Sequence, residues 1–293
     1  MSKKIISLAA GMAMIGGVAM SDTPKVAADI SPVHSLVSRV MLGVGTPDLI
    51  VQAGASPHGY TLRPSEAKAL QDAQMVFWMG ESLSPWMEGA LDTLSSDATI
   101  ITLLERDETI LMEFREGALF EEHDHDDHGD EKHDDHGDHE DHGSHDPHAW
   151  LSPDNARIWL NLIASQLSIV DPENAGTYFA NAAAARSEIE ALKTEVNSLL
   201  EPVRGKKFIV FHDAYQYFEK AFDLSASGAI SLGDSSDPSP ARIQKVQKRI
   251  RNHVLSLSGF GAPQQHGQRS YSQPIEYWDS DFASKVGIAD SSI

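Results

Sequence analysis

Three histidines in separate parts of the chain have side chains and settings that suit a metal ion. His58 lies in GASPHGYTLRPS, His148 in DPHAWLSP and His212 in FIVFHDAYQYF. Three neutral imidazoles can fill three positions of a tetrahedral zinc site and leave the fourth to water or a carboxylate. A single histidine is more often a structural residue, and spacing does not decide between a shared site and three unrelated positions.

The elements around these histidines predict an α/β fold. Apolar runs typical of short strands alternate with segments of helical periodicity, a pattern that favours a parallel sheet flanked by helices. The expected strands are 26–30, 49–51, 75–79, 100–103 and 208–211, and the expected helices are 33–41, 64–73, 85–94, 214–221 and a basic helix at 242–251. His58 and His212 follow strands, where open α/β sheets bind ligands.

Two longer helices are expected after His148. Ser152-Pro153 is a helix start, and Asp171-Pro172 begins a second helix whose apolar residues recur in steps of four and three up to Val203. A helix of about 30 residues spans roughly 45 Å, long enough to join two lobes. A coiled-coil arm is the alternative.

Residues 121–147 differ in kind from the rest of the chain. The stretch holds 13 acidic residues, one lysine and eight histidines, without an apolar side chain. It is therefore expected to be a disordered loop. A solvated acidic loop, a metal reservoir and a metal sensor are all open, and we expect weak, exchangeable metal sites because ordering entropy opposes tight binding. The histidines concerned are His123, His125, His128, His133, His136, His139, His142 and His145.

Composition excludes several classes of protein. The chain has 293 residues, a formal net charge of -20 and no cysteine. A nucleic-acid-binding face is not expected at this charge, and thiolate catalysis, disulfides and cysteine-type zinc fingers are excluded. Residues 1–22 combine Lys3, Lys4, an apolar run and small residues, the pattern of a signal peptide for export, which favours a bacterial periplasm.

The motifs around the three histidines resemble those of the zinc-binding proteins of bacterial ABC importers, the cluster-A metal-binding family. The resemblance covers about Lys25 to Arg251, and a His/Asp-rich insertion is typical of its zinc-selective members. It implies two lobes, each a mostly parallel sheet with flanking helices, joined by one long rigid helix. The lobes would be residues 23–170 and 204–293, with the helix at 171–203.

By this resemblance, His58, His148 and His212 would bind Zn²⁺ between the lobes. An imidazole at His212 favours zinc over manganese. The protein would be a monomer, not an enzyme, that captures zinc in the periplasm and delivers it to a membrane permease. Asp213 either orients an imidazole or caps the following helix.

Two departures from the family pattern qualify the resemblance. Pro57 stands where some relatives have a glutamate that can bind metal, and the pattern stops after Asn252, before an expected acidic ligand. The C-terminal lobe is therefore expected to be incomplete after about residue 252, as a frameshift product or as a divergent C-terminus. The alternatives for function are an exported zinc buffer or metallochaperone, a defective transporter subunit, and a zinc hydrolase.

Overall fold

The computed structural model describes residues 23–115, 119–120, 145–231 and 238–257, with side chains described up to residue 250. The expected signal peptide, most of the His/Asp-rich tract and the C-terminal tail lie outside the described residues.

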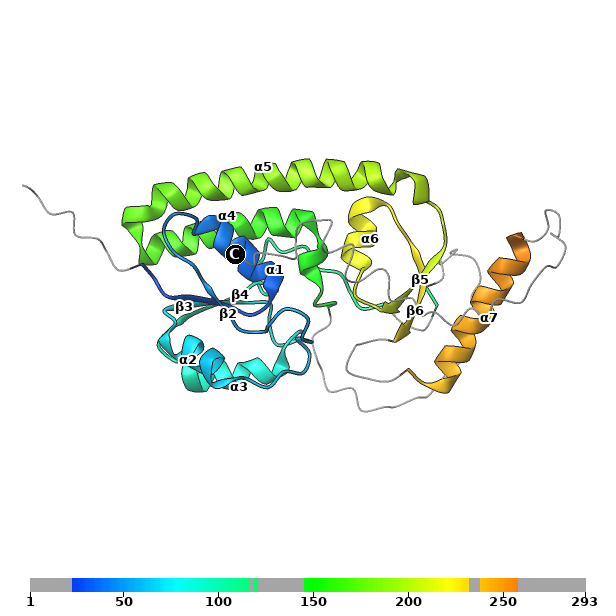
Figure 1. The fold of residues 1–293 in the computed structure, drawn as a ribbon, viewed down its shortest axis with the longest axis horizontal. Helices are drawn as coiled ribbons and strands as arrows, with labels where there is room; N and C mark the ends of the chain where they lie inside the picture. The colour runs from blue at the N-terminus through cyan, green and yellow to red at the C-terminus, as the bar shows by residue number, and fades with distance from the viewer. Residues whose placement is uncertain (1–22, 116–118, 121–144, 232–237, 258–293) are drawn as a thin grey trace, which may run out of the picture.

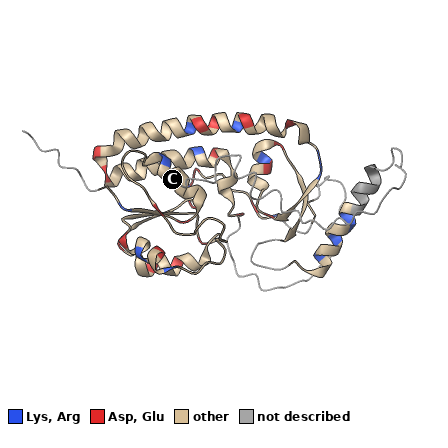
Figure 2. Cartoon of the chain, in the orientation of Figure 1, with Lys and Arg blue, Asp and Glu red and all other residues tan. Residues whose placement is uncertain are grey.

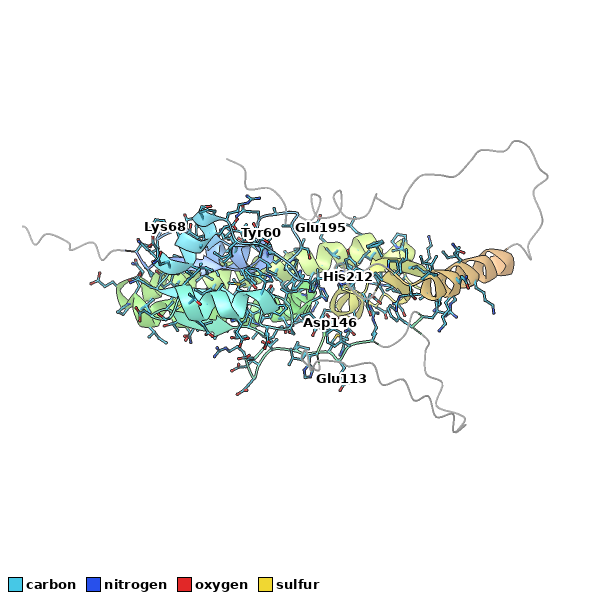
Figure 3. All side chains as sticks on the ribbon, turned by 90° about the horizontal axis from the view of Figure 1, so that it is seen from below. Tyr60, Lys68, Glu113, Asp146, Glu195 and His212 are labelled. Carbon is cyan, nitrogen blue, oxygen red and sulfur yellow. The ribbon has the colours of Figure 1, made fainter. Side chains whose placement is uncertain are left out.

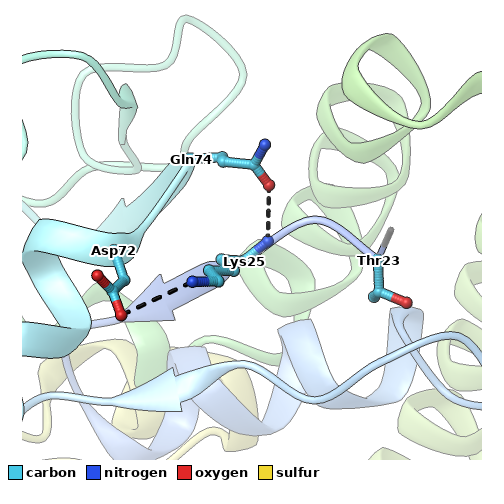
Figure 4. A pocket seen from close by; sticks show the side chains of 4 residues that line it. All are labelled: Thr23, Lys25, Asp72 and Gln74. Atoms are coloured by element: carbon cyan, nitrogen blue, oxygen red, sulfur yellow. Dashed lines mark hydrogen bonds and ion pairs between the residues drawn. The ribbon is translucent and has the colours of Figure 1, made fainter. Parts of the chain in front are cut away.

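The first lobe is built on a parallel four-stranded sheet, as the sequence predicts. The strand order is β2-β1-β3-β4, and every pairing is parallel. The strands are β1 (Val26–Ala28), β2 (Asp48–Leu49), β3 (Met75–Trp78) and β4 (Thr99–Thr102). Just before β1, Lys25 forms an ion pair with Asp72, and its backbone N–H donates to the side chain of Gln74, the residue before β3 (Figure 4).

Helices cover both faces of this sheet (Figure 1). Met75 and Phe77 of β3 pack in the core with α1 (Ser31–Val40), α4 (Pro153–Val170) and α5 (Ala175–Leu200). Val76 and Trp78 point to the other face, toward α2 (Pro64–Asp72) and α3 (Pro85–Leu94). Successive side chains of a strand point to opposite faces, so β3 is buried on both sides.

The long helix runs from the first lobe to the second (Figure 1). Short 3₁₀ turns at Pro172–Asn174 and Glu201–Val203 flank the 26 residues of α5. This helix spans about 39 Å and packs on α4 and α1 of its own chain, which excludes the coiled-coil arm. At its far end, Val196 and Leu200 pack against Phe222 of α6 (Gln216–Phe222).

The second lobe contains a two-stranded parallel sheet within the described residues. Strand β5 (Phe208–His212) pairs with β6 (Ala226–Ser231), and His212 lies opposite Ser231. Strand β6 was not predicted from the sequence, and the expected helix at 214–221 begins at Gln216 instead. The expected basic helix is α7 (Pro240–Leu257), and Figure 2 marks basic but no acidic residues along its described part.

None of the helices among the described residues is long and apolar enough to span a membrane.

Candidate metal centre

The structure brings the three predicted histidines together where the two lobes meet. One ring nitrogen from each of His58, His148 and His212 lies within 4.8 Å of the others. The ring centroids are 5.4 Å apart for His58 and His148, 5.6 Å for His58 and His212, and 4.8 Å for His148 and His212. Figure 3 shows His212 and Asp146 near the middle of the long axis. Residues from three distant segments thus form one candidate site.

The loop that carries His58 connects β2 to α2 and is held by its backbone. The carbonyl of Pro57 accepts hydrogen bonds from the hydroxyl of Ser84 at 3.1 Å and from the indole N–H of Trp86 at 2.8 Å. Pro57 has no side chain that could bind metal, and its carbonyl anchors the adjacent histidine to the start of α3.

The far side of the same loop is closed by Glu66, a buried carboxylate in the first turn of α2. It accepts hydrogen bonds from the hydroxyl of Tyr60 at 2.8 Å and from the backbone N–H of Arg63 at 2.7 Å. A carboxylate near a helix N-terminus is also favoured by the helix dipole. His58 is therefore held between two fixed points.

His148 is the most buried of the three histidines, with 4% of its surface exposed. The Oδ1 atom of Asp146 lies 2.9 Å from the backbone N of His148 and 2.6 Å from its Nδ1. Its Nε2 is buried and has no hydrogen-bond partner among the described residues. A buried polar nitrogen without a partner is costly, and one on an imidazole that is grouped with two other imidazoles suits a metal ion.

Asp146, which lies within hydrogen-bond distance of His148, was not identified from the sequence. It falls inside the stretch predicted to be disordered, 121–147, yet only 1% of its surface is exposed. That prediction is wrong for residues 145–147, because the acid-rich composition hid a carboxylate that is used in the fold. The signal that could have found it is a carboxylate two residues before a candidate ligand in DPHAW.

Asp213, beside His212, has a different partner from those considered. Its carboxylate accepts two hydrogen bonds from Arg115, one of them from Nε at 3.0 Å. Burial raises the pKa of Asp213, and the Arg115 guanidinium opposes that rise. The capping hypothesis is wrong, because α6 begins at Gln216 without a side-chain cap. A role in orienting an imidazole stays a prediction.

Only the end of the His/Asp-rich tract is described. His145 forms an isolated antiparallel bridge with Glu113. The other seven candidate ligands of the weak metal loop, from His123 to His142, lie outside the described residues.

Among the described residues, the three grouped side chains are all histidines. Each can offer a ring nitrogen to a metal ion, and the group includes no carboxylate. Imidazole nitrogens suit zinc, and three protein ligands leave one coordination position open to water or to an exchange partner. Such a site can hold a divalent cation reversibly.

Comparison with known proteins agrees with this chemistry. A family model described as "ZnuA: Zinc-uptake complex component A periplasmic" matches residues 26–267, and so extends beyond Arg251, where the sequence resemblance was expected to end. The high-affinity zinc uptake system protein ZnuA of Paracoccus denitrificans is 46% identical over 256 residues, which cover 83% of this chain and 77% of that protein. The protein of the same name from Brucella abortus is 44% identical, covering 82% and 76%.

Solved structures support the fold. A crystal structure of ZnuA has a TM-score of 0.63 at 22% identity and covers 80% of each chain. A zinc-bound ZnuA deletion mutant also has a TM-score of 0.63, at 23% identity, covering 80% of this chain and 79% of that one. The family match over most of the sequence, with relatives above 40% identity, shows that this chain belongs to the ZnuA family of periplasmic zinc-uptake components.

Proposed function

We propose that this chain captures Zn²⁺ in the periplasm and delivers it to the permease of a zinc ABC importer, without catalysing a reaction. The observation that carries the proposal is the convergence of His58, His148 and His212, with the buried Nε2 of His148 free of other partners among the described residues. The relatives named as high-affinity zinc uptake proteins support zinc as the cargo.

Capture requires only ligand exchange. Zn²⁺ loses water and gains three imidazole nitrogens, and the fourth position keeps a water molecule. Each imidazole must be neutral to bind the metal, so zinc affinity falls as the pH drops through the range in which free imidazole titrates. The protein binds as a monomer, and contact with the permease opens the site and releases the ion.

The test is a calorimetric titration of Zn²⁺ into the metal-free protein. We expect one tight site, which is lost or strongly weakened in His58→Ala, His148→Ala and His212→Ala. His34→Ala is the matched control, because His34 Nε2 lies 3.0 Å from the carbonyl of Pro47 and outside the three-histidine group. Wild-type affinity in all three site variants would refute the proposal.

The role proposed for the His/Asp-rich tract needs its own variant. The deletion should remove residues 121–144 and keep Asp146, because that carboxylate supports His148. We expect fewer weakly bound zinc ions and a nearly unchanged tight constant. A large loss of tight affinity would contradict a buffering role for the tract.

The ends of the chain complete the proposal. Residues 1–22 would be removed as a signal peptide, and residues 23–170, 171–203 and 204–293 would form the first lobe, the connecting helix and the second lobe. An incomplete second lobe after about residue 252 stays a prediction, because the family model matches the sequence as far as residue 267. Mass spectrometry of the periplasmic protein tests the cleavage, and resequencing of the gene tests the frameshift hypothesis, which an uninterrupted reading frame would refute.

A further inference from the structure

Helix α6 of the second lobe contacts Asp146, the hydrogen-bond partner of His148, through a buried amide. The side chain of Gln216, the first residue of α6, is buried. Its Nε2 donates to Oδ2 of Asp146 at 2.6 Å and to the carbonyl of Glu113 at 2.9 Å. The amide of Gln216 therefore links the carboxylate of Asp146 to the backbone at Glu113.

The next residue of α6 reinforces this contact. The hydroxyl of Tyr217 donates to the backbone carbonyl of Asp146 at 2.8 Å and accepts from the backbone N–H of Met112 at 2.9 Å. Burial raises the pKa of Tyr217 to about 12, so the hydroxyl keeps its proton and remains a donor at neutral pH. Asp146 is therefore held by both its backbone and its side chain.

Both oxygens of the Asp146 carboxylate are occupied in different ways. Oδ1 lies against the backbone N and the ring Nδ1 of His148, whereas Oδ2 faces Gln216. Because the carboxylate accepts hydrogen bonds, the proton of a neutral His148 ring is placed on Nδ1, and Nε2 keeps the lone pair that a metal needs.

We propose that Gln216 and Asp146 form a positioning pair, through which helix α6 of the second lobe sets the ring orientation and tautomer of His148 before metal binds. This inference rests on the proposed function for its purpose, but the tautomer is a property of the metal-free protein. Gln216 fixes Asp146, and Asp146 fixes the ring.

The direct test is the tautomer of His148, measured by nitrogen-detected NMR of the histidine rings in the metal-free protein at a pH where they are neutral. We expect the proton on Nδ1 in the wild type, and a mixture of tautomers in Asp146→Ala. Asp171→Ala is the matched control. Asp171 is also a buried carboxylate that accepts from an amide and a tyrosine, and it lies at the opposite end of α4, about 27 Å along that helix.

A proton on Nε2 of His148 in the wild type would overturn the proposal. So would an unchanged tautomer in Asp146→Ala. Neither result depends on zinc, so this failure is distinguishable from failure of the proposed function, which the histidine variants test.

Zinc affinity tests the part played by Gln216. Gln216→Met keeps the length of the side chain and removes its donor, and we expect the tight affinity to fall about tenfold, as for other residues that support metal ligands. A cobalt-loaded sample should show an altered visible spectrum. Asn181→Ala is the control, because it removes an amide that donates to the carbonyls of Val40 and Leu42 in the first lobe.

The two readouts separate positioning from stability. A role in folding alone would lower the free energy of unfolding in Gln216→Met while leaving zinc affinity and the cobalt spectrum at their wild-type values. That outcome would overturn the role proposed for Gln216.

Discussion

Asp29 is an acidic residue whose side chain is fully buried. Its side chain follows β1, has no exposed surface, and accepts backbone hydrogen bonds from Ile30 and Met79, each at 2.7 Å. Burial raises the pKa of Asp29 to about 7, and the backbone donors only partly offset that rise. The carboxyl joins the ends of β1 and β3 at the cost of a titration near neutral pH.

This titration predicts how the stability of the metal-free protein depends on pH. The folded pKa lies above the unfolded value, so the folded state holds an extra proton between the two. The stabilisation is therefore present at low pH and lost as the pH rises through about 7. In this interval Asp29 lowers the free energy of unfolding by up to about 1.4 kcal/mol per pH unit.

Urea unfolding from pH 5 to pH 8 measures this slope. Asp29→Asn should remove the component, whereas Asp97→Asn, at an exposed position, should keep the wild-type slope. Equal slopes in all three proteins would show that Asp29 stays ionised throughout.

At the scale of elements, the segment after β4 ties the two lobes together. We call residues 112–115 and 119–120 the stem. Its Leu119 forms an antiparallel bridge with Gly228 of β6, and the N–H of Phe120 donates to Ser227. Arg115 contacts Asp213 and Glu219, and its guanidinium lies 3.8 Å from the ring centre of Phe120. The stem thus pairs with β6 and provides Arg115 as the counterion of two buried carboxylates.

Replacing Arg115 with methionine should destabilise the protein. Asp213 and Glu219 would be left buried without their cation, and removal of one partner of a buried ion pair costs about 3 kcal/mol. Arg39→Met is the matched control, because the pair of Arg39 with Glu188 is exposed and contributes less than about 1 kcal/mol. Equal losses in urea unfolding would mean that the Arg115 cluster is no stronger than a surface pair.

At the scale of the whole molecule, the long helix and hydrogen bonds from α6 add to the stem in limiting how the lobes can move. The long helix α5 packs on α1 and α4 at one end and on α6 at the other. Gln216 and Tyr217 add hydrogen bonds from α6 to Asp146 and Met112. A continuous helix bends little without a proline or another break, so rotation of one lobe must disturb these contacts.

Small-angle scattering should therefore show only a small change in the radius of gyration when zinc is added to the metal-free protein. The deletion of residues 121–144 should be measured beside it, so that changes in the tract are not mistaken for movement of the lobes. A large decrease in both proteins would indicate hinge closure and contradict a rigid connection.

Much of this architecture follows from local patterns. The alternation of apolar strands and helices predicts the parallel sheet of the first lobe, and the steps of four and three predict the long helix, because these periods arise from backbone geometry. Strand β6 was missed because its sequence, ASGAIS, is mostly small residues with one β-branched side chain. Its strand conformation depends on pairing with β5.

The histidine motifs likewise identify His58, His148 and His212 as candidates from the sequence alone, since a ligand is recognised by its side-chain type. Their support is not local. Gln216 donates a hydrogen bond to Asp146, and Arg115 donates one to Asp213, only because the fold brings together segments that are far apart in the chain. The sequence by itself determines the chemistry of each side chain. The partner of each buried polar group is decided by the tertiary fold, because the fold determines which distant groups come within hydrogen-bond distance.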